Sequence, residues 1–348
     1  MTRTTPSRAG RVRVAVIGGG RNCEHEVSLA SAASVRSALD PARYDVLALT
    51  IGRDGRWQDA DGRPLAGTAA ESVAAALVLL AGCDVAFPAV HGPYGEDGTL
   101  AALLDLADVP YVGAGVRGGA LAMDKWATKL VAEAVGVAVA PGLLVTADDA
   151  DQVVFDGPVV VKPVAAGSSH GVSLVLRAPD LAPALAEALR LDDRVLVEQL
   201  VVGREVDLAV LRRADGSLTV GPPLEIVLDD GRFFDTEQKY EGGARFLIPA
   251  PLSADEHDQL VEASLAVFTA LGCRGVARCD FFLTADGPVL NEVNTMPGMT
   301  ARSQVPKMFA QQGLGYPALL DELVRGALRA DPRTLARPHG VAAERSHA

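Results

Sequence analysis

The stretch that decides the fold reads ARCDFFLT over 277–284, ADG over 285–287 and PVLNEVN over 288–294. Two runs of β-forming residues flank a short segment of turn formers, which predicts an antiparallel hairpin. We expect Thr284 to pair with Pro288 across the three-residue turn. In that register Asp280 lies opposite Glu292.

The same register places Arg278 opposite Asn294 and on the same face as Asp280. Two carboxylates directly opposite each other, in strands otherwise fit for burial, repel and destabilise the pair. A divalent cation between them removes the conflict, and Asp, Glu and Asn oxygens suit Mg²⁺ held together with substrate phosphates. An exposed hairpin face with solvated carboxylates gives the same pattern, so the rest of the chain has to decide.

Composition bounds the class of protein. The 348 residues are enough for about two or three domains, and 49% hydrophobic with 22% charged residues is typical of globular proteins. Acidic residues exceed basic ones by 44 to 32, and the net charge of −12 argues against nonspecific binding to nucleic acid. No apolar run approaches the roughly 18 residues of a membrane span, and the N-terminal MTRTTP lacks the apolar region of a secretory signal.

The cysteines form neither a CxxC pair nor a metal-binding spacing; they are Cys23, Cys83, Cys273 and Cys279. We expect them to behave as small buried hydrophobes in a reducing compartment. Together these features predict a cytoplasmic enzyme whose ends, 1–10 and 331–348, are loosely ordered.

Strands and helices alternate in the first third of the chain, which predicts a parallel sheet with right-handed crossovers. The pattern runs through a strand at 12–17, a helix from Glu24, a strand at 44–51, a helix at 69–80, a strand at 84–90 and a helix at 99–106. Gly18 and Gly20 resemble part of a dinucleotide fingerprint, but Cys23 stands where its third glycine belongs. The segment HGPYGEDG, 91–98, is either a tight loop or a wall of a ligand pocket at the carboxyl end of a strand.

Glycines near 113–119 mark the first predicted domain boundary. A helix from Lys125 to about residue 135 follows, with its apolar face at Trp126, Leu130, Val131 and Val135. Lys125 and Lys129 lie one turn apart on one side of it, where most lysines are solvated.

Lys162 ends an apolar strand-like run, and a lysine there needs an anionic partner to justify partial burial. The next segment, AGSSHG over 166–171, supplies N–H and hydroxyl donors that can wrap phosphates. It is not a Walker A loop, because no Gly-Lys-Ser/Thr precedes a helix. From Val206 the strand pattern becomes antiparallel, and the long polar loop 229–243 is typical of a lid or binding loop. Helices are predicted at 260–271 and 317–328.

The order of these features, rather than any single one, resembles the ATP-grasp superfamily and more closely the D-alanine–D-alanine ligases. The resemblance extends from about residue 12 to 325. The matching segments are EHEVS (24–28), HGPYGEDG (91–98), MDK (123–125), VKP (161–163), GSS (167–169), KY (239–240), NEVN (291–294) and PGMT (297–300).

The resemblance implies that ATP binds between the second and third domains. The residues implied for ATP are Lys125, Lys162, Ser168, Ser169, Glu198, Val201, Glu205 and Lys239. Two Mg²⁺ ions, with Mn²⁺ as a possible substitute, are implied at Asp280, Glu292 and Asn294.

The resemblance also implies sites for two D-alanines. Glu24 would pair with the ammonium of the first, in a trio with Ser168 and Tyr240. Further residues implied near the substrates are His91, Ser303 and Gln304 for binding, and Arg278 and the N–H of Gly298 for the oxyanion. The pair Lys239 and Tyr240 resembles the dipeptide-forming enzymes.

Three features depart from the family pattern: His170 in the glycine loop, Asn22-Cys23 before Glu24, and Gln304 at a variable position. They leave open a ligase with another acceptor, such as D-lactate, D-serine or a natural-product amine. A non-catalytic nucleotide-binding protein is the other alternative class.

We therefore predict an α/β protein with an ATP-grasp fold behind an N-terminal, Rossmann-like parallel-sheet domain. The predicted limits are 11–113 for the N-terminal domain, 114–201 for the small central domain and 202–330 for the C-terminal domain with the metals. We expect a homodimer that binds neither nucleic acid nor membrane.

Overall fold

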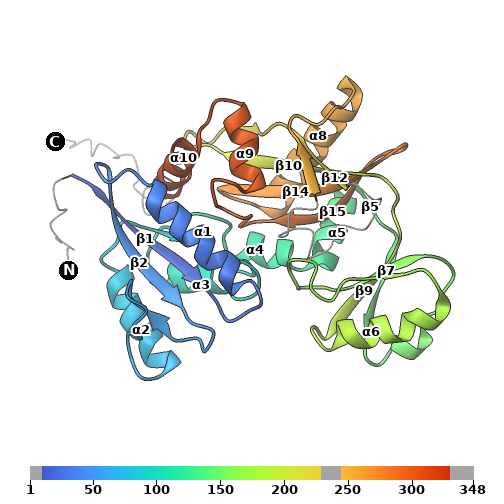
Figure 1. The fold of residues 1–348 in the computed structure, drawn as a ribbon, viewed down its shortest axis with the longest axis horizontal. Helices are drawn as coiled ribbons and strands as arrows, with labels where there is room; N and C mark the ends of the chain where they lie inside the picture. The colour runs from blue at the N-terminus through green and yellow to red at the C-terminus, as the bar shows by residue number, and fades with distance from the viewer. Residues whose placement is uncertain (1–9, 229–243, 330–348) are drawn as a thin grey trace, which may run out of the picture.

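The computed structural model describes residues 10–228 and 244–329, which form three sheets (Figure 1). The first has the order β3-β2-β1-β4, with bounds β1 Val12–Gly19, β2 Tyr44–Ile51, β3 Trp57–Gln58 and β4 Val85–Pro88. Strands β1, β2 and β4 are parallel, as predicted, and only β3 is antiparallel.

Strand β1 is buried along most of its length, as expected for a parallel sheet that is covered on both faces. Val14 and Val16 pack with α1 (His25–Ala38), whereas Ala15 and Ile17 pack with α2 (Ala69–Leu80) and α3 (Thr99–Leu106). The chain leaves β1 at its carboxyl end and enters α1, the edge at which parallel sheets place ligands.

The second sheet is small and antiparallel, with the order β6-β9-β7-β8. Its strands are β6 Gly142–Thr146, β9 Arg194–Gln199, β7 Val159–Pro163 and β8 Ser173–Val175. Helix α6 (Leu181–Leu189) supplies one side of a compact core of valines, leucines and alanines. Between β7 and β8 lies the predicted glycine loop.

The third sheet carries the hairpin and has the order β13-β12-β10-β14-β15-β5, with β11 paired to β10. Its strands are β10 Arg204–Arg212, β11 Leu218–Val220, β12 Leu224–Leu228, β13 Ala244–Leu247, β14 Val276–Thr284, β15 Gly287–Asn294 and β5 Ala138–Val139. Helix α8 (Ala254–Leu271) packs on one face, and α9 (Gln304–Gln311) and α10 (Tyr316–Arg329) pack on the other. The core beneath α9 and α10 also includes Val14 and Val16 of β1, so the first and third sheets share it.

The predicted hairpin exists, but its turn is shorter than predicted. Thr284 pairs with Gly287, not with Pro288, so Ala285 and Asp286 alone form the turn. A register shift beyond Asp280 then compensates, because Asn291 is an extra residue on β15. Asp280 is therefore opposite Glu292, and Arg278 is opposite Asn294, as predicted.

Helices α4 (Val116–Met123) and α5 (Lys125–Ala134) differ from their predictions. Residues of the glycine-rich stretch form α4, because Gly118 and Gly119 let it approach the backbone of neighbouring segments. Helix α5 turns the opposite face inward: Lys125 and Lys129 are buried, whereas Leu130 is 48% exposed.

Helices α4 and α5 pack against α8 and β15. Helix α9 was not predicted, and α8 begins six residues earlier than predicted, where Ser253 and Glu256 form a capping box. Within 10–228 and 244–329, no helix is long and apolar enough to cross a membrane. The domain limits stay predictions.

Burial of α8 on the third sheet can be tested at Phe268, which is fully buried in the core beneath that helix. We expect Phe268→Ala to lower the free energy of unfolding by about 3–5 kcal/mol, because it leaves a cavity. Urea denaturation measures this, with Leu106→Ala, at an 88% exposed position, as the control. Equal losses in the two variants would contradict the packing.

Candidate active site

One cavity of about 1060 Å³ lies where the three sheets meet. Its walls include Glu24 and His91 from the first sheet's loops, Lys162 and Glu198 from the second sheet, and the strands around the hairpin. Every predicted site residue that the structure describes lines this cavity. Besides the four just named, these residues are Lys125, Ser168, Ser169, Val201, Glu205, Arg278, Asp280, Glu292, Asn294, Gly298, Ser303 and Gln304. Lys239 and Tyr240 lie outside the described residues.

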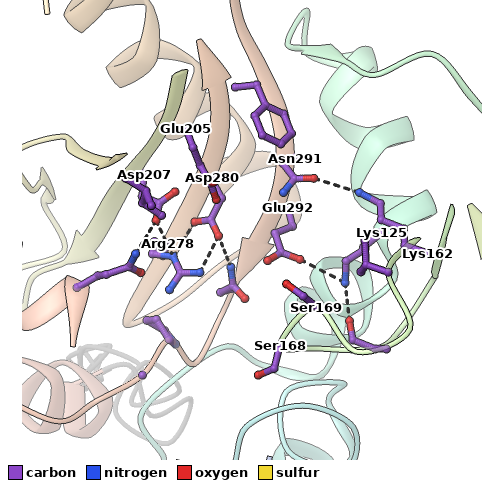
Figure 2. Close-up of a pocket in the computed structure, with 18 of the residues that line it drawn as sticks. Lys125, Lys162, Ser168, Ser169, Glu205, Asp207, Arg278, Asp280, Asn291 and Glu292 are labelled. Atoms are coloured by element: carbon purple, nitrogen blue, oxygen red, sulfur yellow. Dashed lines mark hydrogen bonds and ion pairs between the residues drawn. The ribbon is translucent and has the colours of Figure 1, made fainter. Parts of the chain in front are cut away.

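The hairpin brings Asp280 and Glu292 together with cations from two directions (Figure 2). Arg278 donates to both oxygens of Asp280, from Nε to Oδ1 and from Nη2 to Oδ2, each at 2.6 Å. Lys125 Nζ lies 3.3 Å from Glu292 Oε2. Side-chain cations therefore relieve the predicted repulsion between the carboxylates.

The extra residue in β15 has a direct consequence for the cavity. Asn291 and Glu292 are consecutive, yet both line the cavity, because the bulge interrupts the alternation of the strand. Asn291 Oδ1 accepts a hydrogen bond from Lys162 Nζ at 3.1 Å (Figure 2). The hairpin therefore orients a lysine of the second sheet.

Glu198 holds two lysines of the cavity. Its Oε1 lies 2.8 Å from Lys129 Nζ and its Oε2 lies 2.8 Å from Lys162 Nζ. Burial lowers the pKa of Lys129 to about 8, and nearby Lys162 adds to that effect. Burial would raise the pKa of Glu198, but the two lysines outweigh it and lower the pKa. This buried ion cluster keeps positive charge beside the cavity.

The glycine loop contacts the first sheet's loop at Glu24. Ser168 Oγ donates to Glu24 Oε1 at 2.6 Å, which joins two of the three members of the predicted trio. Ser168 and Ser169 have φ of 51° and 55°, in the left-handed region that side chains rarely adopt. A Cβ at Gly167 would collide with the Glu24 carboxylate in its present position, so glycine leaves room for this contact.

His91 connects the first sheet with the loop after β15. Its Nδ1 donates to the carbonyl of Met296 at 2.7 Å, and its Nε2 accepts from Ser31 Oγ at 2.8 Å. Ser31 in turn accepts from the N–H of Met299. Burial lowers the pKa of His91, which agrees with a neutral ring in this network. These contacts fix the loop that carries Gly298.

The predicted second-substrate residues begin α9. Ser303 precedes the helix and accepts from the N–H of Thr300 at 3.1 Å, and Gly298 lies against it. Gln304 Nε2 donates to Asp207 Oδ2 at 3.0 Å. Gln304 is thus tied to β10 rather than free to rotate in the cavity.

Several cavity residues were missed by sequence reasoning. They are Ser31, Glu96, Lys129, Asp207 and Asn291. Asp207 could have been predicted as a site residue, because a carboxylate in the apolar run VDLAVL needs a charged partner. Lys129 was visible but was placed on a solvated face, and Asn291 depends on a bulge that the alternation pattern does not reveal.

The donor chemistry fits a divalent cation. Asp280, Glu292 and Asn294 supply oxygens on paired strands, and Asn294 Nδ2 donates to Asp280 Oδ2 at 3.0 Å, which leaves its carbonyl oxygen available to a metal. Among the described residues no cluster of three or more His, Cys, Asp and Glu could hold a metal. A metal here therefore depends on the asparagine as well as the carboxylates.

The parallel N-terminal sheet, the small antiparallel sheet and the third sheet enclosing this cavity define an ATP-grasp protein. The family model for the D-ala D-ala ligase N-terminus matches residues 13–114, and that for the C-terminus matches 136–325. The chain belongs to the D-alanine–D-alanine ligase family.

Similar proteins match more than nine-tenths of the chain. The D-alanine–D-alanine ligases of Mycolicibacterium smegmatis and Rhodococcus jostii are 42% and 41% identical, over 92% and 91% of this chain and 96% and 97% of theirs. The VanG D-Ala:D-Ser ligase of Enterococcus faecalis has a TM-score of 0.77 at 31% identity, covering 91% of this chain and 99% of its own. The Bacillus anthracis D-alanine–D-alanine ligase complexed with ATP has a TM-score of 0.75 at 26% identity, with coverage of 92% and 99%.

Glu96 gives this site a pH-dependent contribution to stability. Burial raises its pKa from 4.5 to about 7, and the charge of Glu24 adds to the rise. Because the folded state binds this proton more tightly, the contribution is fully present below about pH 4.5 and is lost as pH rises through about 7.

Glu96→Gln removes this titration. We expect the difference in free energy of unfolding, wild type minus variant, to fall as pH rises from about 5 to about 8. Urea denaturation across that range measures it, with Glu133→Gln at an exposed position as the control. A difference that is constant with pH would contradict the raised pKa.

Proposed function

We infer that the protein joins two molecules of D-alanine into D-alanyl-D-alanine with ATP, a step of peptidoglycan precursor synthesis. One observation carries this inference: a single cavity holds the buried lysines, the paired carboxylates and the Glu24–Ser168 contact. Forming an amide bond in water is uphill, so a carboxylate must first be activated by ATP as an acyl phosphate.

We propose that Lys125 and Lys162 bind the ATP phosphates. Both are buried beside the cavity, and both are held by anionic or carbonyl oxygens that phosphate oxygens could replace. Ser168 and Ser169 would close over the phosphates from the loop 166–171, and Lys239 would add a further cation. Val201, through its backbone, and Glu205 would meet the adenine and ribose, with Glu198 beside the adenine and holding Lys162.

Asp280, Glu292 and Asn294 would hold Mg²⁺, two ions by analogy with the family, with Mn²⁺ as a substitute. Such a metal neutralises charge on the transferring phosphoryl group. The described geometry supports this assignment because the two carboxylates are paired across β14 and β15 and line the cavity.

We assign the first D-alanine to Glu24, whose carboxylate would pair with the substrate ammonium while Ser168 holds it. Tyr240 would complete that trio. Arg278 and the N–H of Gly298 would stabilise the oxyanion of the tetrahedral intermediate. Ser303 and the backbone of Gln304 would bind the carboxylate of the second D-alanine, and His91 would fix the loop that carries Gly298. Homodimerisation and a cytoplasmic location stay predictions.

A coupled assay tests the substrate. We expect ADP release and D-alanyl-D-alanine only when D-alanine, ATP and Mg²⁺ are all present. D-serine and D-lactate, offered as second substrates beside D-alanine, separate the dipeptide former from other acceptors. Preference for one of them would overturn the acceptor assignment and leave the mechanism intact. ATP binding without phosphate release from any of them would overturn the enzyme assignment.

The metal assignment is tested by Glu292→Gln, which keeps the shape of the side chain and removes its charge. We expect turnover to fall by about a thousandfold or more, because charge on the phosphoryl group is no longer neutralised. Glu322→Gln is the matched control, since Glu322 is a buried carboxylate in α10 paired with arginines away from the cavity. Near-normal activity of a folded Glu292→Gln would remove the metal from this pair.

A further inference from the structure

Three carboxylates, not two, form a row across the third sheet. Asp207 of β10 is the pairing partner of Asp280 in β14, which is the partner of Glu292 in β15. All three line the cavity. Arg278 lies over the middle of this row, between Asp280 and Asp207 (Figure 2). The metal assignment uses only Asp280 and Glu292, so Asp207 adds a third negative charge to the row.

Arg278 and a divalent cation compete for the same carboxylate. The guanidinium occupies both oxygens of Asp280, and Asn294 donates to one of them as well. A metal at the Asp280–Glu292 pair needs at least one Asp280 oxygen within its coordination shell. The charge of a metal at that oxygen repels the guanidinium and weakens its two hydrogen bonds to Asp280.

We propose that Asp207 is a positioning residue that receives Arg278 when a divalent cation takes Asp280. This inference rests on the proposed function, in which Asp280 binds metal and Arg278 faces the substrates. Asp207 keeps the guanidinium at the substrate side of the row during that exchange. It touches neither the metal nor the reacting atoms.

The geometry of Asp207 suits this role. Its Oδ2 lies 3.5 Å from Arg278 Nε, close enough that a small rotation completes a charged hydrogen bond. Its side chain is only 1% exposed, so the attraction to Arg278 is weakly screened by water. Gln304 donates to the same oxygen and holds the carboxylate in place.

The charges around Arg278 also support this role for Asp207. Arginine stays protonated in proteins, and this guanidinium lies between the carboxylates of Asp280 and Asp207. A buried permanent cation displaced from one carboxylate is costly unless a second anion receives it. Without Asp207, Arg278 would remain on Asp280 and oppose the entry of the metal.

Binding of Mn²⁺ in the presence of ADP tests this without turnover, by titration calorimetry or by electron paramagnetic resonance of free Mn²⁺. We expect Asp207→Asn to weaken Mn²⁺ binding by about tenfold, the scale of one charged hydrogen bond. In an Arg278→Gln background the same change should weaken it clearly less than in the wild type, because only the through-space charge of Asp207 is then removed. Glu322→Gln should leave Mn²⁺ binding unchanged.

Two results would overturn the positioning role. One is unchanged Mn²⁺ affinity in Asp207→Asn; the other is an equal loss with and without Arg278, which would make Asp207 a simple through-space charge. Measurements on the wild-type protein distinguish a failure of the role of Asp207 from a failure of the proposed function. Mn²⁺ binding without ADP release from D-alanine would contradict the proposed function and leave the role of Asp207 standing.

Discussion

The structure depends on how it neutralises the row of carboxylates formed by Asp207, Asp280 and Glu292. Adjacent strands hold these side chains in register, so their repulsion cannot be relieved by moving apart. Arg278 from the same strand and Lys125 from α5 supply the compensating charge. The third sheet and α5 must therefore pack together before the row becomes stable.

The cations of the cavity come from several parts of the chain, namely α5, β7 and β14, which explains why the site lies between the sheets. Lys125 contacts both Glu292 and the carbonyl of Ala166 in the glycine loop, so it joins the third sheet to the second. The glycine loop reaches Glu24 of the first sheet through Ser168. The geometry for phosphate and for substrate is thus set by one continuous chain of polar contacts.

Much of this arrangement could be read from the sequence, because strand alternation and turn residues act locally. The pairing of Asp280 with Glu292 followed from period-2 alternation even though the turn was one residue shorter than expected. The bulge at Asn291 could not be predicted. The turn is one residue shorter than expected and β15 has one extra residue, so the two differences offset each other and the alternation pattern does not change. The buried lysine face of α5 was missed because ion pairs with distant Glu198 and Glu292 override the local preference of lysine for solvent.

The ion pairs of the cavity also constrain how ligands enter. We expect a divalent cation on Asp280 and Glu292 to weaken their contacts with Arg278 and Lys125, and a polyphosphate on Lys125 and Lys162 to compete with Glu292 and Glu198 for those lysines. Either ligand alone leaves buried charges without their former partners, which is costly. When both ligands bind together, the metal pairs with the carboxylates and the polyphosphate pairs with the lysines, so the buried charges keep partners of opposite sign. We therefore expect metal and nucleotide to favour each other's binding, because each supplies charge partners for the groups that the other leaves unpaired.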